Sequence, residues 1–166
     1  MSAETDPRPT IEVDLSINGR SRRLTIEPRE TVAEVLRGRL ALTGTKVSCD
    51  AQVCGTCTVL LDNRPVSACS VLAADAEGQA LETIEGLADP ESGDLSPLQQ
   101  AFIDHAAFQC GFCTPGFLMA ATALLREEPD PSRERVMEAL EGNICRCTGY
   151  VPIVDAVLSA ARRSAP

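Results

Sequence analysis

Eight cysteines in two sets of four constrain this chain of 166 residues more than any other feature. In the first set, Cys49, Cys54 and Cys57 follow the spacing C-x4-C-x2-C, and Cys69 comes after eleven further residues. This is the plant-type spacing of a [2Fe–2S] cluster with a distant fourth ligand. Gly55 lies inside the loop and lets its backbone approach a cluster closely, because it has no side chain.

The second set consists of Cys110, Cys113, Cys145 and Cys147. The first two lie at the start of one expected helix, and the other two lie on the loop that enters another. A helix N-terminus favours thiolates through its free N–H groups and its dipole. We therefore expect two facing helix starts to hold a second two-iron cluster. The likeness of C-G-T-C-T at 54–58 to C-G-F-C-T at 110–114 indicates a shared chemical demand.

Zinc, disulfide and thioredoxin-type roles fit the cysteines less well. Four thiolates suit zinc, but structural zinc sites use C-x2-C-like knuckles that the first set fits poorly. The polar N-terminus has no apolar core of a signal peptide, which predicts a cytoplasmic chain in which disulfides are disfavoured. A thioredoxin-type C-x2-C lacks its βαβ setting. His105 is the only histidine, which excludes a Rieske centre, and we expect it to be an ordinary residue within a helix.

Charge and hydropathy exclude two classes of partner. The formal net charge of −9 argues against a basic face for nucleic acid or a membrane surface. No stretch approaches the roughly 18 apolar residues of a transmembrane helix. We expect neither a nucleic-acid partner nor a transmembrane segment.

A β-hairpin is predicted at the start of the first domain, residues 11–85. Residues 1–10 are predicted to be a flexible tail, and I-E-V-D-L-S-I at 11–17 then alternates apolar and polar residues. The Asn18-Gly19 pair is a strong hairpin turn signal, and Leu24 and Ile26 continue the alternation on the return strand.

A helix and further strands are predicted to complete this domain. Thr31 and Glu34 form a capping box, and Gly44 ends the helix. Its apolar stripe consists of Val32, Val35, Leu36 and Leu40. Further strands are expected at 58–62 and 66–68, joined through Asn63-Arg64-Pro65, and at 81–84. Strands, one helix and more strands predict an α+β fold.

A four-helix bundle is predicted for residues 95–166, after a linker at 86–94 that is rich in glycine, proline and acids. Helix starts are signalled at Ser96-Pro97, Thr114-Pro115 and Ser132, and a fourth helix is expected at 153–161. Residues expected in its core are Leu98, Phe102, Ile103, Ala106, Phe117, Met119 and Met137.

The cysteine motifs together resemble a known family. The stretches S-C-D-A-Q-V-C-G-T-C-T-V-L-L-D, F-Q-C-G-F-C-T-P-G and G-N-I-C-R-C-T-G-Y resemble the iron–sulfur subunit of molybdenum hydroxylases, the xanthine oxidase and carbon monoxide dehydrogenase family. All eight cysteines match in order and spacing. The resemblance implies a β-grasp ferredoxin domain followed by a four-helix bundle, each with a [2Fe–2S] cluster.

The resemblance also implies partners and a role. A large subunit would carry molybdopterin cytosine dinucleotide and a medium subunit FAD, in a dimer of heterotrimers. Electrons would pass from the molybdopterin through the helical-domain cluster and the ferredoxin-domain cluster to FAD. The chain would thus be part of an oxidoreductase without carrying its substrate chemistry. A free-standing electron carrier and a zinc-stabilised interaction module remain as alternatives.

Two residues are expected at the pterin by resemblance. These are Gln109, which precedes the first helical-domain cysteine, and Cys147, the last cluster cysteine. A loop hydrogen bond without a ligand is the alternative role for Gln109. Ser48 departs from the pattern, since relatives often have glycine there, and no functional conclusion follows from it.

Overall fold

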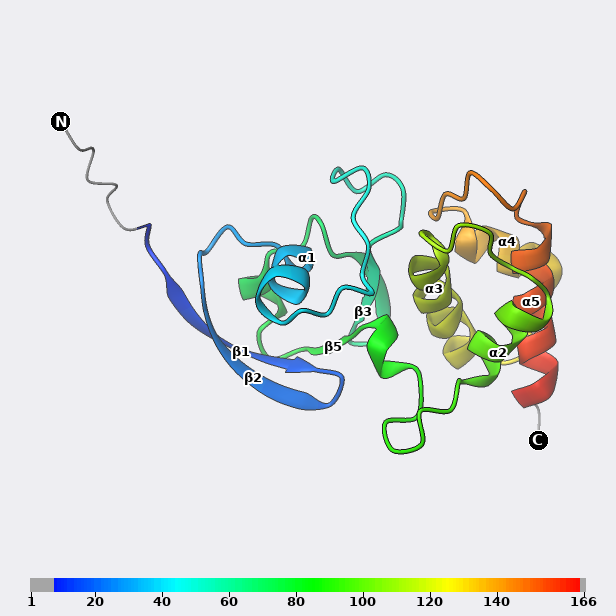
Figure 1. The fold of residues 1–166 in the computed structure, drawn as a ribbon, viewed down its shortest axis with the longest axis horizontal. Helices are drawn as coiled ribbons and strands as arrows, with labels where there is room; N and C mark the ends of the chain where they lie inside the picture. Colours follow the sequence, from blue (N-terminus) through cyan, green and yellow to red (C-terminus); the bar gives the residue numbers. More distant parts are fainter. Residues whose placement is uncertain (1–7, 165–166) are drawn as a thin grey trace.

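The computed structural model describes residues 8–164 and places a β-sheet unit beside a helical unit (Figure 1). The predicted flexible tail at 1–10 lies outside the described residues except for its last three. Of these, Arg8 contacts Glu27 at 3.3 Å. The described chain therefore begins in contact with the hairpin region that follows it.

Within residues 8–164, five strands form one mixed sheet in the order β2-β1-β5-β3-β4. Their bounds are β1 Ile11–Ile17, β2 Arg20–Ile26, β3 Thr58–Leu61, β4 Arg64–Ser67 and β5 Ala80–Glu82. Strands β1 and β5 are parallel, and the other neighbours are antiparallel. With one helix packed on the sheet, this is the expected β-grasp arrangement.

The first hairpin follows the predicted alternation. Val13, Leu15 and Ile17 point into the core, whereas the residues between them are exposed. Asn18 and Gly19 take left-handed φ angles of 49° and 72°, as the preferred two-residue hairpin turns require. The predicted hairpin is therefore confirmed.

The first helix is shorter than predicted and of mixed type. The α-helix α1 spans Val32–Glu34 and continues as a π-helix, η1, at Val35–Arg39. The predicted end at Gly44 is wrong, because Ala41 takes a left-handed φ of 56° and turns the chain away. The loop to β3, which carries the first three cysteines, therefore begins earlier than expected.

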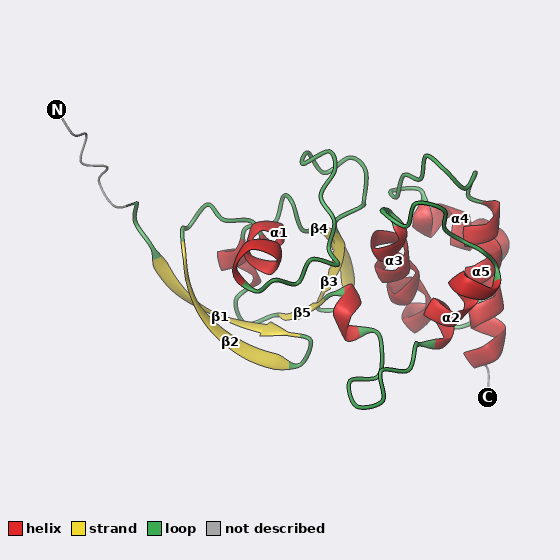
Figure 2. Cartoon of the chain, in the orientation of Figure 1, coloured by secondary structure: helices red, strands yellow, loops and turns green. Residues whose placement is uncertain are grey.

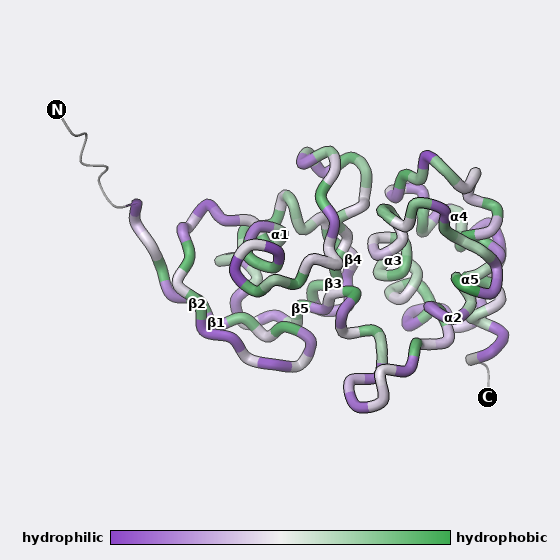
Figure 3. The backbone as a smooth tube through the Cα atoms, viewed as in Figure 1, coloured by the Kyte–Doolittle hydropathy of each residue, from purple (hydrophilic) through white to green (hydrophobic). Residues whose placement is uncertain are grey.

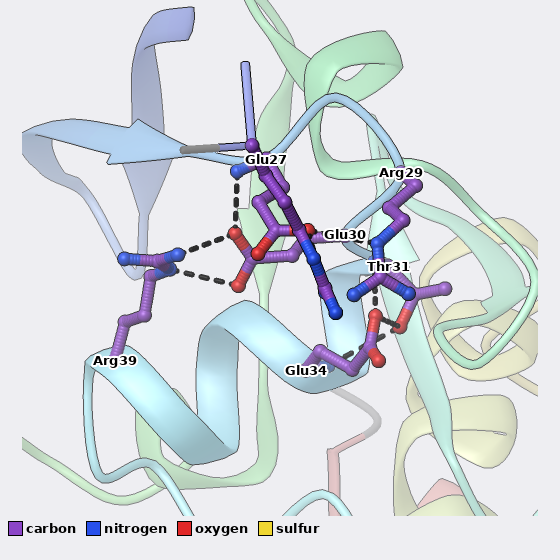
Figure 4. Close-up of polar contacts among 7 residues, drawn as sticks. Glu27, Arg29, Glu30, Thr31, Glu34 and Arg39 are labelled. Carbon is purple, nitrogen blue, oxygen red and sulfur yellow. Dashed lines mark hydrogen bonds and ion pairs between the residues drawn. The ribbon is translucent and has the colours of Figure 1, made fainter. Parts of the chain in front are cut away.

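A polar network joins the end of β2 to this helix (Figure 4). Glu34 N donates to Thr31 Oγ1 at 3.2 Å and Thr31 N donates to Glu34 Oε2 at 2.8 Å, which confirms the predicted capping box. Arg39 donates two hydrogen bonds to Glu30, which also accepts one from Glu27 N at 2.6 Å. The Arg39 guanidinium holds the pKa of Glu30 below its ordinary range. The network fixes the helix against the hairpin.

The second hairpin turns earlier than predicted. Asp62 and Asn63 form the turn with φ angles of 48° and 64°, so Arg64 and Pro65 belong to β4 and not to the turn. Pro65 is tolerated there because β4 is an edge strand. The last strand also ends two residues earlier than predicted, at Glu82.

Four helices of the described chain form the second unit, a bundle (Figure 2). They are α2 Pro97–Asp104, α3 Thr114–Glu127, α4 Arg133–Leu140 and α5 Val151–Ser164. Ser96 and Ser132 cap α2 and α4 as predicted, accepting from Gln99 N and Arg135 N. Helix α5 is longer than the expected 153–161.

Several details of the helical prediction are wrong. Cys113, not Thr114, is the N-cap of α3, and the Thr114 hydroxyl is buried without a hydrogen-bond partner in the described chain. His105 is the C-cap of α2 rather than a residue within it. Ile103 and Met137 are 49% and 55% exposed, because each of these eight-residue helices buries only one narrow face.

Of the remaining residues expected in the core, four are buried and one is exposed. Leu98, Phe102, Phe117 and Met119 are buried, as predicted. Ala106 is exposed, because it follows the end of α2 and turns the chain with a φ of 48°. The buried face of α2 is thus narrower than the predicted stripe.

The two units meet where α3 packs across β3. Leu60 of β3 forms a small buried cluster with Met119 and Ala123 of α3. Arg126 of α3 donates two hydrogen bonds of 2.8 Å to the Glu82 carboxylate on β5. The interface is therefore both apolar and charged. It also lies close to the 3-10 helix η3, Ile84–Gly86, from which the connection to the bundle leaves the sheet.

Hydropathy follows this architecture. Hydrophobic residues are concentrated in segments that face the two cores, whereas β2 and the connection after η3 are largely hydrophilic (Figure 3). In the part of the chain that the structure describes, no helix combines the length and apolar character needed to cross a bilayer.

Candidate metal centres

The eight cysteines lie on the loops between strands and at the starts of helices. The loop before β3 carries Cys49, Cys54 and Cys57, and Cys69 follows β4. The turns before α3 and α5 carry the other four. In Figure 1, the cyan loop above β3 and the orange loop above α5 both lie at the top of the view. The sequence-predicted ligands are therefore brought to neighbouring positions.

The sulfur atoms meet in pairs. The Sγ atoms of Cys110 and Cys147 are 3.7 Å apart. The Cys145 thiol also lies near enough to Cys113 to raise its pKa. Four thiolates around two irons leave two for each iron, so the paired arrangement fits the donor set of a [2Fe–2S] cluster. Among the described residues, no three His, Cys, Asp or Glu side chains gather as a single-ion site.

The thiols of the first set also influence one another. The Cys54 thiol helps to lower the pKa of Cys49, and the Cys69 thiol helps to raise that of Cys57. Cys57 and Cys69 are buried, whereas Cys49 is exposed. Burial, together with the neighbouring Cys69 thiol, raises the pKa of Cys57 to about 11. Without a metal, the Cys57 thiol therefore stays protonated at neutral pH, and metal binding must displace this proton.

Backbone amides stabilise the exposed thiolate of the first set. Val53 N lies 3.4 Å from Cys49 Sγ, and the amides of Val53, Ala51 and Cys54 lower the pKa of Cys49 to about 7. This geometry depends on left-handed residues in the loop, such as Gln52 with φ 57°. Successive amides in such a loop point to one concave side and favour negative charge there.

In the second set the environment of each sulfur is different. Burial, followed by the Cys145 thiol, raises the pKa of Cys113 to about 12. Burial also acts to raise the pKa of Cys145, but hydrogen bonds from the Thr148 hydroxyl and from the Thr148 and Cys147 amides outweigh it and lower that pKa. The Cys110 thiol raises the pKa of Cys147.

The two similar pentapeptides have similar turns. Gly55 and Gly111 both take left-handed φ angles, of 65° and 77°, and each carbonyl accepts a hydrogen bond from the amide three residues on. Thr58 also donates its hydroxyl to Gly55 O at 2.7 Å, whereas the Thr114 hydroxyl has no partner in the described chain. The two pentapeptides are therefore alike in their backbone conformation around the sulfur atoms.

The two cysteine loops are hydrogen-bonded to each other. Ile144 N, next to Cys145, donates to Cys54 O at 2.9 Å. The buried Asn143 side chain donates from Nδ2 to Gly55 O at 2.8 Å. These contacts join the backbone beside one candidate centre to the backbone beside the other.

Glycines allow this close approach. A Cβ atom on Gly55 would lie 2.4 Å from Gly142 O, and one on Gly116 would lie 2.3 Å from Gly55 O. Gly55 was expected to give a cluster access to the loop backbone. The structure shows a second reason for glycine at this position, which is that its backbone packs closely against the helical unit.

The residues expected at the pterin also lie together. Gln109 Nε2 donates to Cys147 O at 3.1 Å, and both residues are exposed. Ser48, the departure from the family pattern, is exposed in the first loop.

Sequence reasoning missed the residues that support the sulfurs. Asn143, Ile144, Thr148 and Tyr150 all lie in the stretch E-G-N-I-C-R-C-T-G-Y around the second pair. The sequence did contain a signal for these contacts. Polar residues between ligands in a tight loop need hydrogen-bond partners for their own side chains and amides. Which partners they choose depends on the docking of the two units.

Exposed apolar side chains flank the cysteines along the chain. Val53 is 64% exposed beside the first set. Beside the second set, the exposed large apolar residues are Phe108, Phe112, Ile144, Tyr150 and Val151. We call these six residues the apolar rim. Large apolar side chains that are exposed close to one site are typical of a surface covered by another protein.

Comparisons with known proteins agree with this arrangement. Two family models match the chain, a 2Fe-2S iron-sulfur cluster binding domain at 15–88 and a [2Fe-2S] binding domain at 83–158. The nicotine 6-hydroxylase small subunit of Paenarthrobacter nicotinovorans is 52% identical over 158 residues, with 94% of each chain covered.

Solved structures give the same result. Quinoline 2-oxidoreductase from Pseudomonas putida 86 superposes with a TM-score of 0.87 at 46% identity, covering 93% of this chain and 98% of that chain. Aldehyde oxidoreductase from Desulfovibrio desulfuricans ATCC 27774 gives 0.87 at 48% identity, covering 92% of this chain but only 17% of the longer one. The chain belongs to the family of small [2Fe–2S] iron–sulfur subunits of molybdenum hydroxylases, in which its role is electron transfer.

Proposed function

We propose that the chain relays single electrons from a molybdopterin centre in a large subunit to FAD in a medium subunit. Two cysteine sets serve as ligands, one for each [2Fe–2S] cluster. They are Cys49, Cys54, Cys57 and Cys69 in the ferredoxin domain, and Cys110, Cys113, Cys145 and Cys147 in the helical domain. A [2Fe–2S] cluster, when bound, supplies one-electron redox chemistry.

The observation that carries this proposal is that the two four-cysteine sites lie on loops that are hydrogen-bonded to each other. The Sγ atoms of Cys110 and Cys147 lie 3.7 Å apart, the Cys69 and Cys145 thiols are near enough to raise the pKa of Cys57 and Cys113, and Ile144 N donates to Cys54 O between the two loops. A carrier that handled only one cluster would have no need of this connection. The backbone here keeps the two sites at a fixed separation.

The proposed order places the helical domain on the molybdenum side. Its support is Gln109, which is held against Cys147 O beside an exposed thiol pair. In this proposal both residues contact the pterin of the large subunit, and the apolar rim is covered by partner subunits. We also propose a ferredoxin domain at 11–85, a linker at 86–94 and a helical domain at 95–166. The complex is proposed to assemble as a dimer of heterotrimers.

Substrate choice is assigned to the partner. Relatives at comparable identity are named for nicotine, nicotinate and aldehydes, so the small subunit accompanies different chemistries. A cytoplasmic location is a further part of the proposal, since disulfides are rare in reducing compartments and all eight cysteines are assigned here to clusters.

Metal analysis and electron paramagnetic resonance (EPR) on the purified complex test this function. About four irons and four acid-labile sulfides per small subunit are expected for two such clusters, with two EPR signals after dithionite reduction. Cys113→Ser should remove the helical-domain signal and stop flavin reduction by substrate, whereas Cys57→Ser should remove the other signal. Zinc in place of iron, or rapid flavin reduction in Cys113→Ser, would contradict the proposal.

A further inference from the structure

Thr148 follows the last cysteine and is bonded to the sulfur of Cys145. Its Oγ1 lies 3.2 Å and its backbone N 3.4 Å from Cys145 Sγ. Thr148 is partly buried, and Cys145 is only 7% exposed. Water is therefore largely kept from competing for this sulfur.

The surrounding loop decides which way the hydroxyl points. Tyr150 N donates to Thr148 Oγ1 at 3.2 Å, so this oxygen already accepts one hydrogen bond from the backbone. The hydroxyl proton is then free to be donated to Cys145 Sγ. This orientation makes Thr148 a donor to sulfur and not an acceptor.

Tyr150 in turn is held in place by a hydrogen bond and by a ring contact. Its hydroxyl accepts a hydrogen bond from Cys145 N at 3.1 Å, and its ring packs edge-on against the buried Phe117 with centroids 6.2 Å apart. Its φ of 70° is left-handed, a conformation that costs a non-glycine residue about 1 kcal/mol or more. The loop is thus held in one shape that keeps Thr148 against the sulfur.

The sulfurs of the two pairs are treated differently. Cys145 accepts from the Thr148 hydroxyl and from the amides of Thr148 and Cys147. The exposed Cys147, by contrast, contacts the thiol of Cys110 and accepts from the Cys110 amide. The hydroxyl hydrogen bond from Thr148 is therefore made to the buried Cys145 and not to the exposed Cys147.

From this geometry we propose that Thr148 sets the reduction potential of the helical-domain cluster through its hydroxyl hydrogen bond to Cys145. The inference rests on the proposed function, in which Cys145 is a ligand. Reduction adds one electron and no proton, so the site becomes more negative. A donor to a ligand sulfur stabilises the more negative state and raises the potential. Thr148 thereby makes this cluster easier to reduce than it would be without the hydroxyl hydrogen bond.

The test is an EPR-monitored redox titration of the purified complex with dithionite. Thr148→Val should lower the equilibrium constant for one-electron reduction of the helical-domain cluster roughly tenfold, about 59 mV for a one-electron couple. Thr148→Ser keeps the hydroxyl and should stay close to the unmodified protein. Thr122→Val makes the same substitution at a hydroxyl that donates to Leu118 O within α3, and it should shift nothing.

The ferredoxin-domain signal in each sample is an internal reference and should not move. An unchanged helical-domain potential in Thr148→Val would overturn the inference, and an equal shift in Thr122→Val would do so as well. Absence of a helical-domain signal in the unmodified complex would instead overturn the proposed function.

A second measurement covers the case in which Thr148→Val loses its cluster. Brief exchange of the reduced, unmodified complex into D2O replaces the Thr148 hydroxyl proton before the more slowly exchanging backbone amides that also bond Cys145. Pulsed electron–nuclear double resonance should then detect a newly coupled deuteron at the helical-domain cluster. No coupled deuteron would contradict a hydroxyl bond to the ligand sulfur.

Discussion

Ile144 N donates a 2.9 Å hydrogen bond to Cys54 O, and this bond joins the two cysteine loops. Ile144 is covalently next to Cys145, so the two candidate ligands are separated by one residue and one hydrogen bond. The contact belongs to the backbone, and only proline at position 144, which lacks the N–H and also fixes φ, would remove it directly. The register of the two loops is therefore better probed through the groups around this bond.

Asn143 is the first of these groups. Its buried Nδ2 donates to Gly55 O at 2.8 Å, and Asn143→Ala should reduce the free energy of unfolding by about 1–3 kcal/mol, through the lost hydrogen bond and the cavity. Asn143→Asp should be worse at neutral pH, because the introduced carboxylate faces a carbonyl oxygen. Denaturant unfolding of the complex measures both, and equal stability of Asn143→Asp and the unmodified protein would contradict this account.

Gly116 is expected to be intolerant of any side chain. A Cβ there would lie 2.3 Å from Gly55 O, so Gly116→Ala should push α3 away from the first loop and destabilise the protein by about 2 kcal/mol, despite the better helix propensity of alanine. Weaker magnetic coupling between the two reduced clusters would report the separation. Gly142→Ala is the matched control, because its Cβ would have nothing within 4 Å. Similar effects of the two substitutions would refute the steric explanation.

The strands, the existence of the α-helices, the capping box of Thr31, the cap at Ser96 and the grouping of the cysteines could be predicted from the sequence. Each depends on local chemistry that a short window contains. The partners of Asn143 could not, because Gly55 lies 88 residues away along the chain. The exposure of Met137 could not either, since helical spacing shows which residues share a face but not how wide a face the neighbours cover.

Gln109 is expected to act in electron entry and not in cluster assembly. Its Nε2 donates to Cys147 O at 3.1 Å on the exposed side of the helical domain. Gln109→Ala in the complex should slow cluster reduction by substrate in stopped-flow experiments about tenfold or more, with both EPR signals intact, because a misplaced contact weakens coupling to the pterin. Gln100→Ala, on the outer face of α2, is the control. Unchanged kinetics in Gln109→Ala would leave only the loop hydrogen bond as its role.

Arg126 should make the stability of the domain interface depend on pH. Its hydrogen bonds to Glu82 hold the pKa of that carboxyl below its ordinary value of 4.5. A carboxyl with a depressed folded-state pKa stabilises the fold above that ordinary value, and the contribution is lost as the pH falls through the folded-state pKa. Both side chains are partly exposed, so Arg126→Ala should cost under about 1 kcal/mol at pH 7.

The difference between Arg126→Ala and the unmodified complex should shrink as the pH falls from 5 to about 3, because protonation of Glu82 removes the same interaction. Unfolding curves at several pH values measure this convergence. Arg162→Ala, which alters an exposed arginine on α5, should leave the pH profile unchanged. A constant difference between Arg126→Ala and the unmodified protein over this range would mean that Arg126 acts by packing against β5 and not through the charge of Glu82.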